Sequence, residues 1–435
     1  MRKAILIVLL ACLTWGCSNK DKSMTSLPDL NAVRANLAFT CKHEVDHFPP
    51  LDPASDKLFQ YARYLEKKDG PKDFNEVARY YRIAAAHGHY RANQNLQLLV
   101  SEGSASSPNP EQESIVLAEQ LIAEGVPSGY FDIGHYLLNG YGLKQNEDMA
   151  RRYIRKAADL GNPDAQYYIA DLLNPADMAP DIAIQMFRCA ADQGHAQAAY
   201  DLGDISQIKH QYTEAIKAFQ MAVTAGSSNA ALMLESGFNG ATEGNRLSYV
   251  GVQKDTERSR RYNLIGKFID ANDGRNPKVS DIDKIVPLPP ARLPPWNGTF
   301  QWQKEQDAAV PPQKPSEELI DQLAKTKHLD PATGLPLAGM LGKISQEEQP
   351  TNVNARLPLG TVANTGESCP EDGVWCAKLK EGQIGDAQRP FLKGDKLPSL
   401  VVYEPRTLPF LDRLMGTRRQ TLQVAWKLVA HIDQA

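Results

Sequence analysis

The chain has 435 residues, of which 42% are hydrophobic and 23% are charged, and its formal net charge is −4 at pH 7. This length allows two or three globular domains. Nucleic-acid binding depends on a clustered basic surface, so the near-neutral charge balance argues against nucleic acid as the main partner.

The first residues predict an export signal. A short basic start, Met1 to Lys3, precedes thirteen apolar residues, and the chain becomes polar at Ser18. The apolar run is too short to span a bilayer, as in a cleaved signal peptide. The junction between Gly16 and Cys17 resembles the processing site of bacterial lipoproteins.

The resemblance implies that residues 1–16 are removed and that Cys17 is lipidated. Thr14 and Trp15 depart from the usual aliphatic and small residues of such a site, and an earlier alternative site would leave a signal of only eleven residues. An ordinary secretory signal is the other alternative. Ser18 directly after the cysteine indicates the outer membrane in such lipoproteins, with the polypeptide facing the periplasm.

The stretch CKHEVDHFPP contains His43, Glu44 and His47 in the H-E-x-x-H pattern of zinc proteases. Such a site needs both histidines on one face of a helix and a third ligand from a supporting domain. The prolines that follow push the residue before them out of the α region, so a helix cannot continue. We therefore expect no metal here and interpret residues 17–53 as an anchor tether that leads to the first helices.

A period of 32 to 37 residues covers the next part of the chain. Glycines that follow alanine-rich helical strings mark it, with a small residue four positions later and an aliphatic residue eight positions later. These glycines are Gly88, Gly125, Gly161, Gly194 and Gly226. Glycine ends a helix at low cost, and small residues let the next helix pack closely. The pattern predicts an α-solenoid of helix pairs over residues 54–274.

The repeats resemble the Sel-1-like branch of the tetratricopeptide superfamily. The best match is NGYGLKQNEDMARRYIRKAADLGNPDAQYYIADLL (139–173), whose GYGL string resembles the longer inter-helix turn of that family. The units around Gly194 and Gly226 lack this turn and are closer to ordinary tetratricopeptide length. We expect an opening helix at 54–68 and a terminal capping helix at 257–270.

One helix of each pair lines the inner face of such a solenoid. We expect the residues six and ten positions after each glycine to point there. In three adjacent repeats these are Phe131 and His135, Tyr167 and Asp171, and Tyr200 and Asp204. Aromatic anchors are common at interfaces, so we predict that these six residues, here called the stripe, bind a protein partner. The alternative is that the rings pack on each other or on the C-terminal half.

The second half begins with a proline-rich region. Nine prolines in residues 276–315 exclude long helices, yet the region is too apolar for a free linker. We predict an ordered extended strap over residues 275–342, with one short helix at 316–329 for which Ser316 is the N-cap. Residues 343–360 are the expected mobile connector.

Short apolar runs separated by Gly, Pro and Asp predict a small β-rich module over residues 361–435. The motif C-P-x-x-G-x-W and the motif R-x-F-x-x-G-x-x-x-P, which begins at Arg389, resemble a module of bacterial immunity proteins encoded beside secreted toxins. Val374 stands where that module often has an aromatic residue.

Four cysteines besides Cys17 lie in the mature chain, in a compartment that permits disulfides. Cys369 and Cys376 flank a hairpin-turn pair, so we expect a disulfide between them. A second bridge could join Cys41 to Cys189. A metal at Cys369 and Cys376 would need further Cys or His ligands nearby, which the sequence does not supply.

No catalytic constellation accompanies these features. The chain has no G-x-S-x-G motif, no P-loop, and no G-x-G-x-x-G that opens a helix after a strand. We therefore expect no enzyme and no cofactor.

The signal, repeats, strap and terminal module together resemble lipoproteins that are immunity partners of type VI secreted lipases, notably of the phospholipase D class. The resemblance implies stoichiometric inhibition of a toxin by protein-protein contact, with the stripe as the grip. A general envelope scaffold or adaptor is the alternative, and an anchored metalloprotease is the third.

Overall fold

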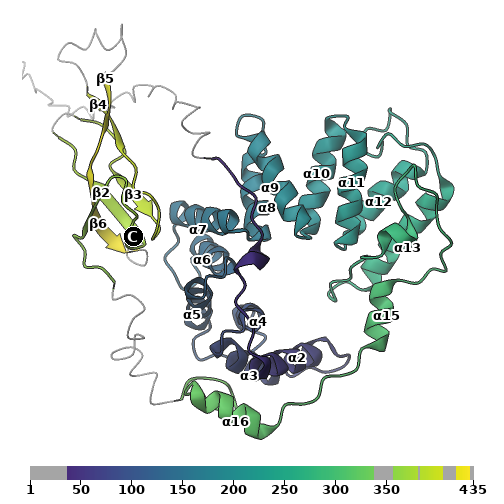
Figure 1. The fold of residues 1–435 in the computed structure, drawn as a ribbon, viewed down its shortest axis with the longest axis horizontal. Coiled ribbons are helices and arrows are strands. Elements are labelled where there is room, and N and C mark those ends of the chain that lie inside the picture. The colour runs from purple at the N-terminus through teal and green to yellow at the C-terminus, as the bar shows by residue number, and fades with distance from the viewer. Residues whose placement is uncertain (1–36, 338–355, 381–382, 405–417, 432–435) are drawn as a thin grey trace, which may run out of the picture. The chain divides into compact units, whose positions relative to one another are not determined.

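The computed structural model describes residues 37–337, 356–380, 383–404 and 418–431. The described part is mainly α-helical, with a series of helix pairs, a strap and a small antiparallel β module (Figure 1). This is the predicted fold class. The predicted lipidation site Cys17 and most of the connector 343–360 lie outside the described residues.

The helical series begins with the 3-10 turn η1 (Glu44–His47) and the opening helix α2 (Pro53–Lys67). Each helix packs against its neighbours in the chain, and α13 (Thr256–Ala271) ends the series, so the expected opening and capping helices are both present. The helices between them are α3 (Phe74–Ala86), α4 (Tyr90–Ser101), α5 (Pro110–Ala123), α6 (Ser128–Asn139), α7 (Glu147–Leu160), α8 (Pro163–Leu173), α9 (Pro180–Asp192), α10 (Ala196–Ile208), α11 (Tyr212–Thr224) and α12 (Ser228–Phe238).

The repeat glycines end the first helix of each pair, as the period predicted. All five have positive φ angles, between 78° and 111°. The small and aliphatic residues of the period are buried in the core. At Gly129 a Cβ atom would lie 2.6 Å from the carbonyl oxygen of Ala118, so only glycine lets α6 come this close to α5.

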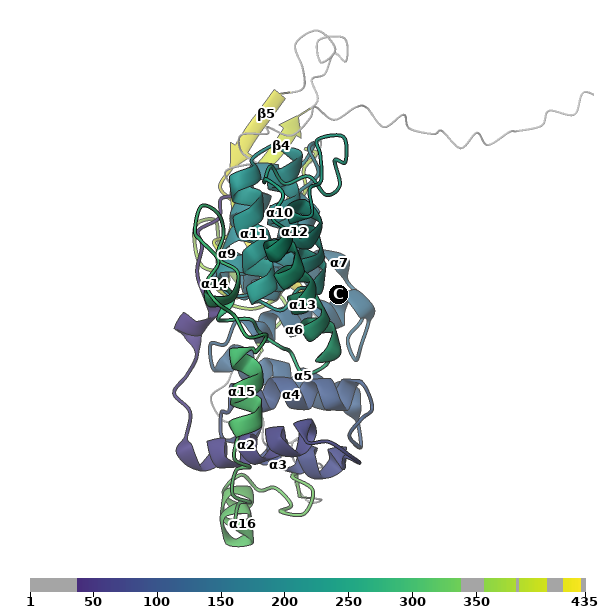
Figure 2. The ribbon, with the colours of Figure 1, turned by 90° about the vertical axis from the view of Figure 1, so that its right-hand side faces the viewer.

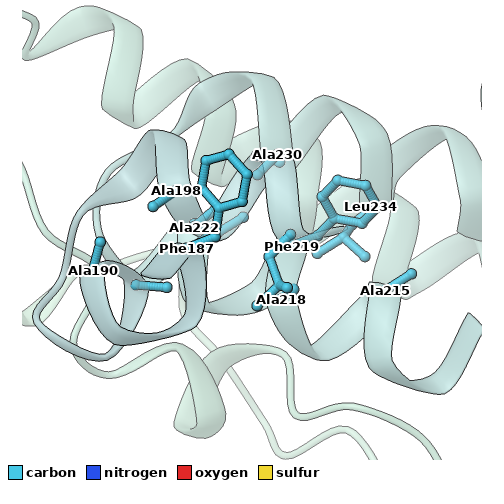
Figure 3. Packing of buried hydrophobic residues seen from close by; sticks show 14 of the residues in the cluster. Phe187, Ala190, Ala198, Ala215, Ala218, Phe219, Ala222, Ala230 and Leu234 are labelled. Carbon is cyan, nitrogen blue, oxygen red and sulfur yellow. The ribbon is translucent and has the colours of Figure 1, made fainter. Parts of the chain in front are cut away.

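The core of the series combines large rings with alanines. Phe187 of α9 and Phe219 of α11 are fully buried, and alanines of the neighbouring helices surround them (Figure 3). Close packing of this kind makes each ring sensitive to changes of a single methylene group. The same cluster continues into the strap through residues such as Ile285 and Phe300.

The strap packs on the last helix of the series. The guanidinium group of Arg261 in α13 donates to the carbonyl oxygens of Ile285 (2.6 Å) and Pro294 (2.8 Å). Phe268 stacks on Phe300, with ring centroids 3.9 Å apart. The strap contains α14 (Ile282–Ile285) and α15 (Gln301–Ala308) in addition to the single short helix predicted, because residues 301–308 carry no proline.

The far end of the strap contacts the first helix pair. α16 (Glu317–Thr326), which Ser316 caps as predicted, packs on α3. The Leu323 carbonyl lies 3.0 Å from Nε2 of His87, and Arg82 donates to the carbonyl oxygen of Thr333 at 3.3 Å. Figure 2 shows α15 between α13 and α16. The strap therefore touches both the last and the first repeat.

The C-terminal module is β-rich, as predicted. β1 (Val362–Asn364), β6 (Ala425–His431), β2 (Gly373–Ala377) and β3 (Gln388–Phe391) form an antiparallel sheet in that order, and β4 (Leu400–Glu404) pairs with β5 (Arg418–Leu422). Trp375 and Trp426 are fully buried at the centre of the module.

Among the helices that the structure describes, none is both long enough and apolar enough to cross a membrane.

Candidate functional site

The stripe lies on the second helix of three consecutive pairs. α6 carries Phe131 and His135, α8 carries Tyr167 and Asp171, and α10 carries Tyr200 and Asp204. The three rings and the Asp204 carboxylate are half-buried, whereas His135 and Asp171 are exposed. Each pair sits one helical turn apart, so the two side chains are neighbours on one face of their helix.

The tyrosine rings of the stripe pack on phenylalanines of the following helix. Tyr167 lies 5.8 Å from Phe187, and Tyr200 lies 5.5 Å from Phe219, between ring centroids. The rings thus pack partly on the protein itself, as in the alternative interpretation. Tyr167 also stacks on His195, which caps α10, with ring centroids 4.6 Å apart, and the rings of the stripe stay partly exposed. Rings fixed in this way lose little freedom when a partner binds.

Asp201 joins two repeats of the stripe, although the repeat spacing did not single it out. The Tyr167 hydroxyl donates a hydrogen bond to its carboxylate, and Gln197 donates a second at 2.8 Å. Burial raises the pKa of Asp201. Burial, together with the charge of Asp201, raises the pKa of Asp204 to about 6. Both acids therefore lie in an environment that disfavours uncompensated negative charge.

A cavity of about 840 Å³ adjoins the stripe at Tyr200 and Asp204. Its other walls come from the end of α10, the start of α11, α12 and the loop 239–255. The remaining lining residues are Gln207, Ile208, His210, Tyr212, Met233, Glu243, Arg246, Leu247 and Tyr249.

Hydrogen bonds and ring contacts hold the loop 239–255 against α10 and α11. The side-chain amide of Gln207 donates to the carbonyl oxygens of Arg246 (3.2 Å) and Tyr249 (2.9 Å). Tyr249 meets Tyr212 edge to face at 5.1 Å, and the Tyr212 hydroxyl lies 2.7 Å from Nδ1 of His210. This loop carries no repeat period, so sequence reasoning missed it as part of the site.

The H-E-x-x-H stretch binds to the repeats instead of forming a zinc site. His43 is extended and precedes the 3-10 turn, so the two histidines do not share a face of an α-helix. The Glu44 carboxylate is buried and accepts a hydrogen bond from Asn162 at 3.1 Å, and burial raises its pKa. The backbone N–H of Glu44 donates to Gln193 at 2.9 Å.

A disulfide fixes this stretch to α9. Cys41 and Cys189 are bonded, with Cα atoms 5.6 Å apart, so the bridge that the sequence left open is present. The donor atoms of Cys41, His43 and Cys189 lie within 4.8 Å of one another. Because both sulfurs are in the disulfide, neither is a thiolate that could bind a metal.

The predicted bridge between Cys369 and Cys376 is wrong for this structure, in which both are free thiols. Cys369 is buried in the module core beside Trp375. Cys376 follows Trp375 in β2, and successive side chains of a strand point to opposite faces. The two sulfurs are therefore directed to different sides of the sheet.

Comparison with known families agrees with the helix-pair architecture. Three segments, residues 58–89, 127–162 and 163–195, match the Sel1 repeat. Residues 230–337, which hold the cavity loop and the described strap, match a domain of unknown function, DUF6396. The chain thus carries a Sel1-repeat α-solenoid.

Several individual proteins are similar to this chain. An uncharacterized protein of Neisseria meningitidis is 26% identical over 177 residues. The match covers 40% of this chain and 35% of that protein, so this chain spans about a third of the relative's length. Two solved immunity proteins of Pseudomonas aeruginosa are 29% and 27% identical, with TM-scores of 0.48 and 0.49. Each match covers 58% of this chain, and 95% and 94% of those proteins, respectively.

Proposed function

We propose that this protein is a periplasm-facing lipoprotein, anchored through Cys17 at the outer membrane, that binds and neutralises a type VI secreted phospholipase toxin of the phospholipase D type. It acts as an immunity protein by stoichiometric protein-protein inhibition and not by catalysis. The stripe grips the toxin.

The observation that carries this proposal is the set of fixed, partly exposed rings of the stripe. Tyr167 and Tyr200 are fixed from behind by Phe187 and Phe219, and acidic side chains flank them on successive repeats. Rigid aromatic anchors in a polar surround are the usual energetic centre of protein interfaces. The Cys41–Cys189 bridge supports an oxidising compartment such as the periplasm. The resemblance of the signal, strap and terminal motifs to phospholipase immunity lipoproteins supplies the kind of partner.

The test is protection of cells that are made to export a type VI phospholipase toxin of the same strain to their periplasm. The native chain should restore growth and copurify with the toxin in a one-to-one complex. Tyr167→Ala combined with Tyr200→Ala should weaken the affinity at least about tenfold, as expected for interface anchors. Tyr64→Ala in α2, a half-buried tyrosine outside the stripe, is the matched control. Growth arrest in the presence of the native chain would refute the proposal.

A general envelope scaffold is the second candidate, and the Sel1 repeat matches favour it because such repeats present extended binding surfaces. Pull-down from envelope extracts separates the two. A scaffold would capture resident envelope proteins and leave the toxin active.

A further inference from the structure

We infer that the cavity between α10, α12 and the loop 239–255 receives a lysine or arginine side chain from an extended segment of the protein partner. This inference rests on the partner-binding role proposed above and names the chemistry of one contact. Four features of the cavity support it: its charge, its rings, its apolar rim and its position beside the stripe.

The acidic lining of the cavity favours a cationic ligand. The carboxylate of Asp204 lines it, and Asp201 lies close enough to disfavour a second negative charge. Among the described residues, neither acid forms an ion pair. Burial and then the charge of Asp201 raise the pKa of Asp204, whereas a bound ammonium or guanidinium group would lower it by favouring the carboxylate.

Other charged groups of the cavity leave room for that cation. Glu243 accepts a hydrogen bond from the Tyr249 hydroxyl, which adds a second acid to the lining. Arg246 also lines the cavity, but its side chain is exposed and forms no ion pair among the described residues. His210 is engaged with the Tyr212 hydroxyl.

Three tyrosine rings line the same cavity. Tyr200 is fixed by Phe219, and Tyr212 and Tyr249 brace each other edge to face. A cation over the face of an aromatic ring is attracted by the ring quadrupole, and this attraction grows when the site excludes water. Carboxylates combined with aromatic faces thus suit a protonated amine or a guanidinium group.

The rim of the cavity suits the aliphatic stem and flanking residues of a polypeptide. Ile208 is 77% exposed and Leu247 is 83% exposed, although both are large apolar residues. Long basic side chains cover apolar surface with their methylene groups while the charged end reaches a polar partner. Because Tyr200 and Asp204 belong to both the stripe and the cavity, the partner surface continues from one to the other. That continuity favours a protein over a free small cation.

The test uses the full mature chain and fluorescently labelled hepta-lysine, with hepta-glutamate as the charge control, in anisotropy titrations at low salt. Native protein should bind hepta-lysine and should show no binding of hepta-glutamate. Asp204→Asn should weaken hepta-lysine binding about five- to tenfold, the effect of one partly desolvated charge and its ring partners. Asp192→Asn removes an equal charge from an exposed position on α9 and should change nothing.

A second variant separates the rings from the charge. Tyr212→Leu should also weaken hepta-lysine binding while the protein keeps its helical circular dichroism, because the ring lies at the edge of α11. Equal affinity of native protein and Asp204→Asn for hepta-lysine, or an equal loss in Asp192→Asn, would overturn the inference. Capture of the phospholipase is scored separately. Its failure refutes the proposed function, whereas the peptide titrations decide the cavity.

Discussion

Asn162 and Glu44 are joined by a hydrogen bond of 3.1 Å although 118 residues separate them in the chain. The amide of Asn162 therefore recognises a carboxylate in the middle of the H-E-x-x-H stretch. Gln166 donates to the carbonyl oxygen of Lys42 at 3.0 Å, and Gln193 accepts from the backbone of Glu44. The stretch that carries the H-E-x-x-H pattern of zinc proteases is thus an extended segment that the repeats of the same chain bind.

Gly161 should be a sensitive glycine of the repeats, because a side chain there would meet the backbone of the H-E-x-x-H stretch. Its φ is 111°, and a Cβ atom there would lie 2.6 Å from the carbonyl carbon of His43. Gly161→Ala should lower the free energy of unfolding by about 2–4 kcal/mol through backbone strain and overpacking. Denaturant unfolding measures the loss, and proteolysis near Lys42 should become faster.

The matched control for that change is Gly194→Ala. Gly194 has a similar φ of 85° but no atom within 4 Å of its Cβ position. It should lose only about 1–2 kcal/mol, from strain alone, and should protect Lys42 as the native chain does. Equal losses in the two variants would show that the contact with His43 is not formed.

Removal of the Cys41–Cys189 bridge should destabilise the helical series. The bridge closes a loop across 148 residues, so its loss restores much freedom to the unfolded chain. Replacing both cysteines by serine should cost about 2–5 kcal/mol in denaturant unfolding. Adding a reductant should have the same effect on the native chain and none on the variant. Cys376→Ser, which removes a free thiol, should leave the native stability unchanged.

Asp132 of α6 should make the protein less stable as the pH rises from about 4 to 7. Burial, and then the charges of Glu44 and Asp164, raise its pKa to about 7, and Gln97 donates to it at 3.2 Å. Between its ordinary value and 7 the folded state binds the proton and the unfolded state does not, so stability is greatest at the acidic end. Asp132→Asn should remove most of this dependence, which amounts to at most about 4 kcal/mol for a shift of this size. Asp192→Asn should keep it, and parallel pH curves for all three proteins would contradict the assignment.

Two neighbouring arginines should differ sharply in what they contribute to the strap. Arg261 is buried and donates to the carbonyl oxygens of Ile285 and Pro294 as well as to Glu257. Arg260 is exposed, and its ion pair among the described residues is with Glu257 alone. Arg261→Ala leaves buried acceptors unpaired and should cost about 2–4 kcal/mol. Arg260→Ala should cost less than about 1 kcal/mol. Thermal unfolding of both variants compares them directly, and similar melting temperatures would refute the role of Arg261.

The free thiols of the C-terminal module should differ in reactivity. Burial raises the pKa of Cys369 to about 12, whereas Cys376 is only half-buried. Iodoacetamide at pH 8 should label Cys376 in the native protein and Cys369 only after denaturation, because the thiolate is the reactive form. Mass spectrometry identifies the labelled peptides. If neither cysteine is labelled in denaturant without reductant, the two are bridged.

The repeats could be predicted from the sequence because their rules are local. Each glycine ends one helix, and the next buried residues follow at fixed spacing, so the period located α3 to α12. The binding role of the stripe stays a prediction. The strap helix α16 could also be predicted from a local signal, because Ser316 caps it. Helix α15 was not predicted, because the high proline content of the strap conceals that residues 301–308 carry no proline.

Contacts between distant residues could not be predicted in this way. No residue near Glu44 in the sequence indicates that it bonds to Asn162. The loop 239–255 forms a wall of the cavity because Gln207, which belongs to another repeat, binds its carbonyl oxygens. The wrong disulfide has the same origin. A short spacing favoured Cys369 with Cys376, but the alternation of side chains along β2 decides which thiols can meet.

The strap also limits how this protein can evolve. Ordinary repeat arrays gain or lose a unit with little penalty, because each unit contacts only its neighbours. Here one segment contacts α13 through Phe300 and α3 through α16, and residues 309–316 between its helices carry three prolines and no helix. An added or deleted unit would change the span that this segment has to bridge. The number of repeats is therefore tied to the length of the strap, and the two can change only together.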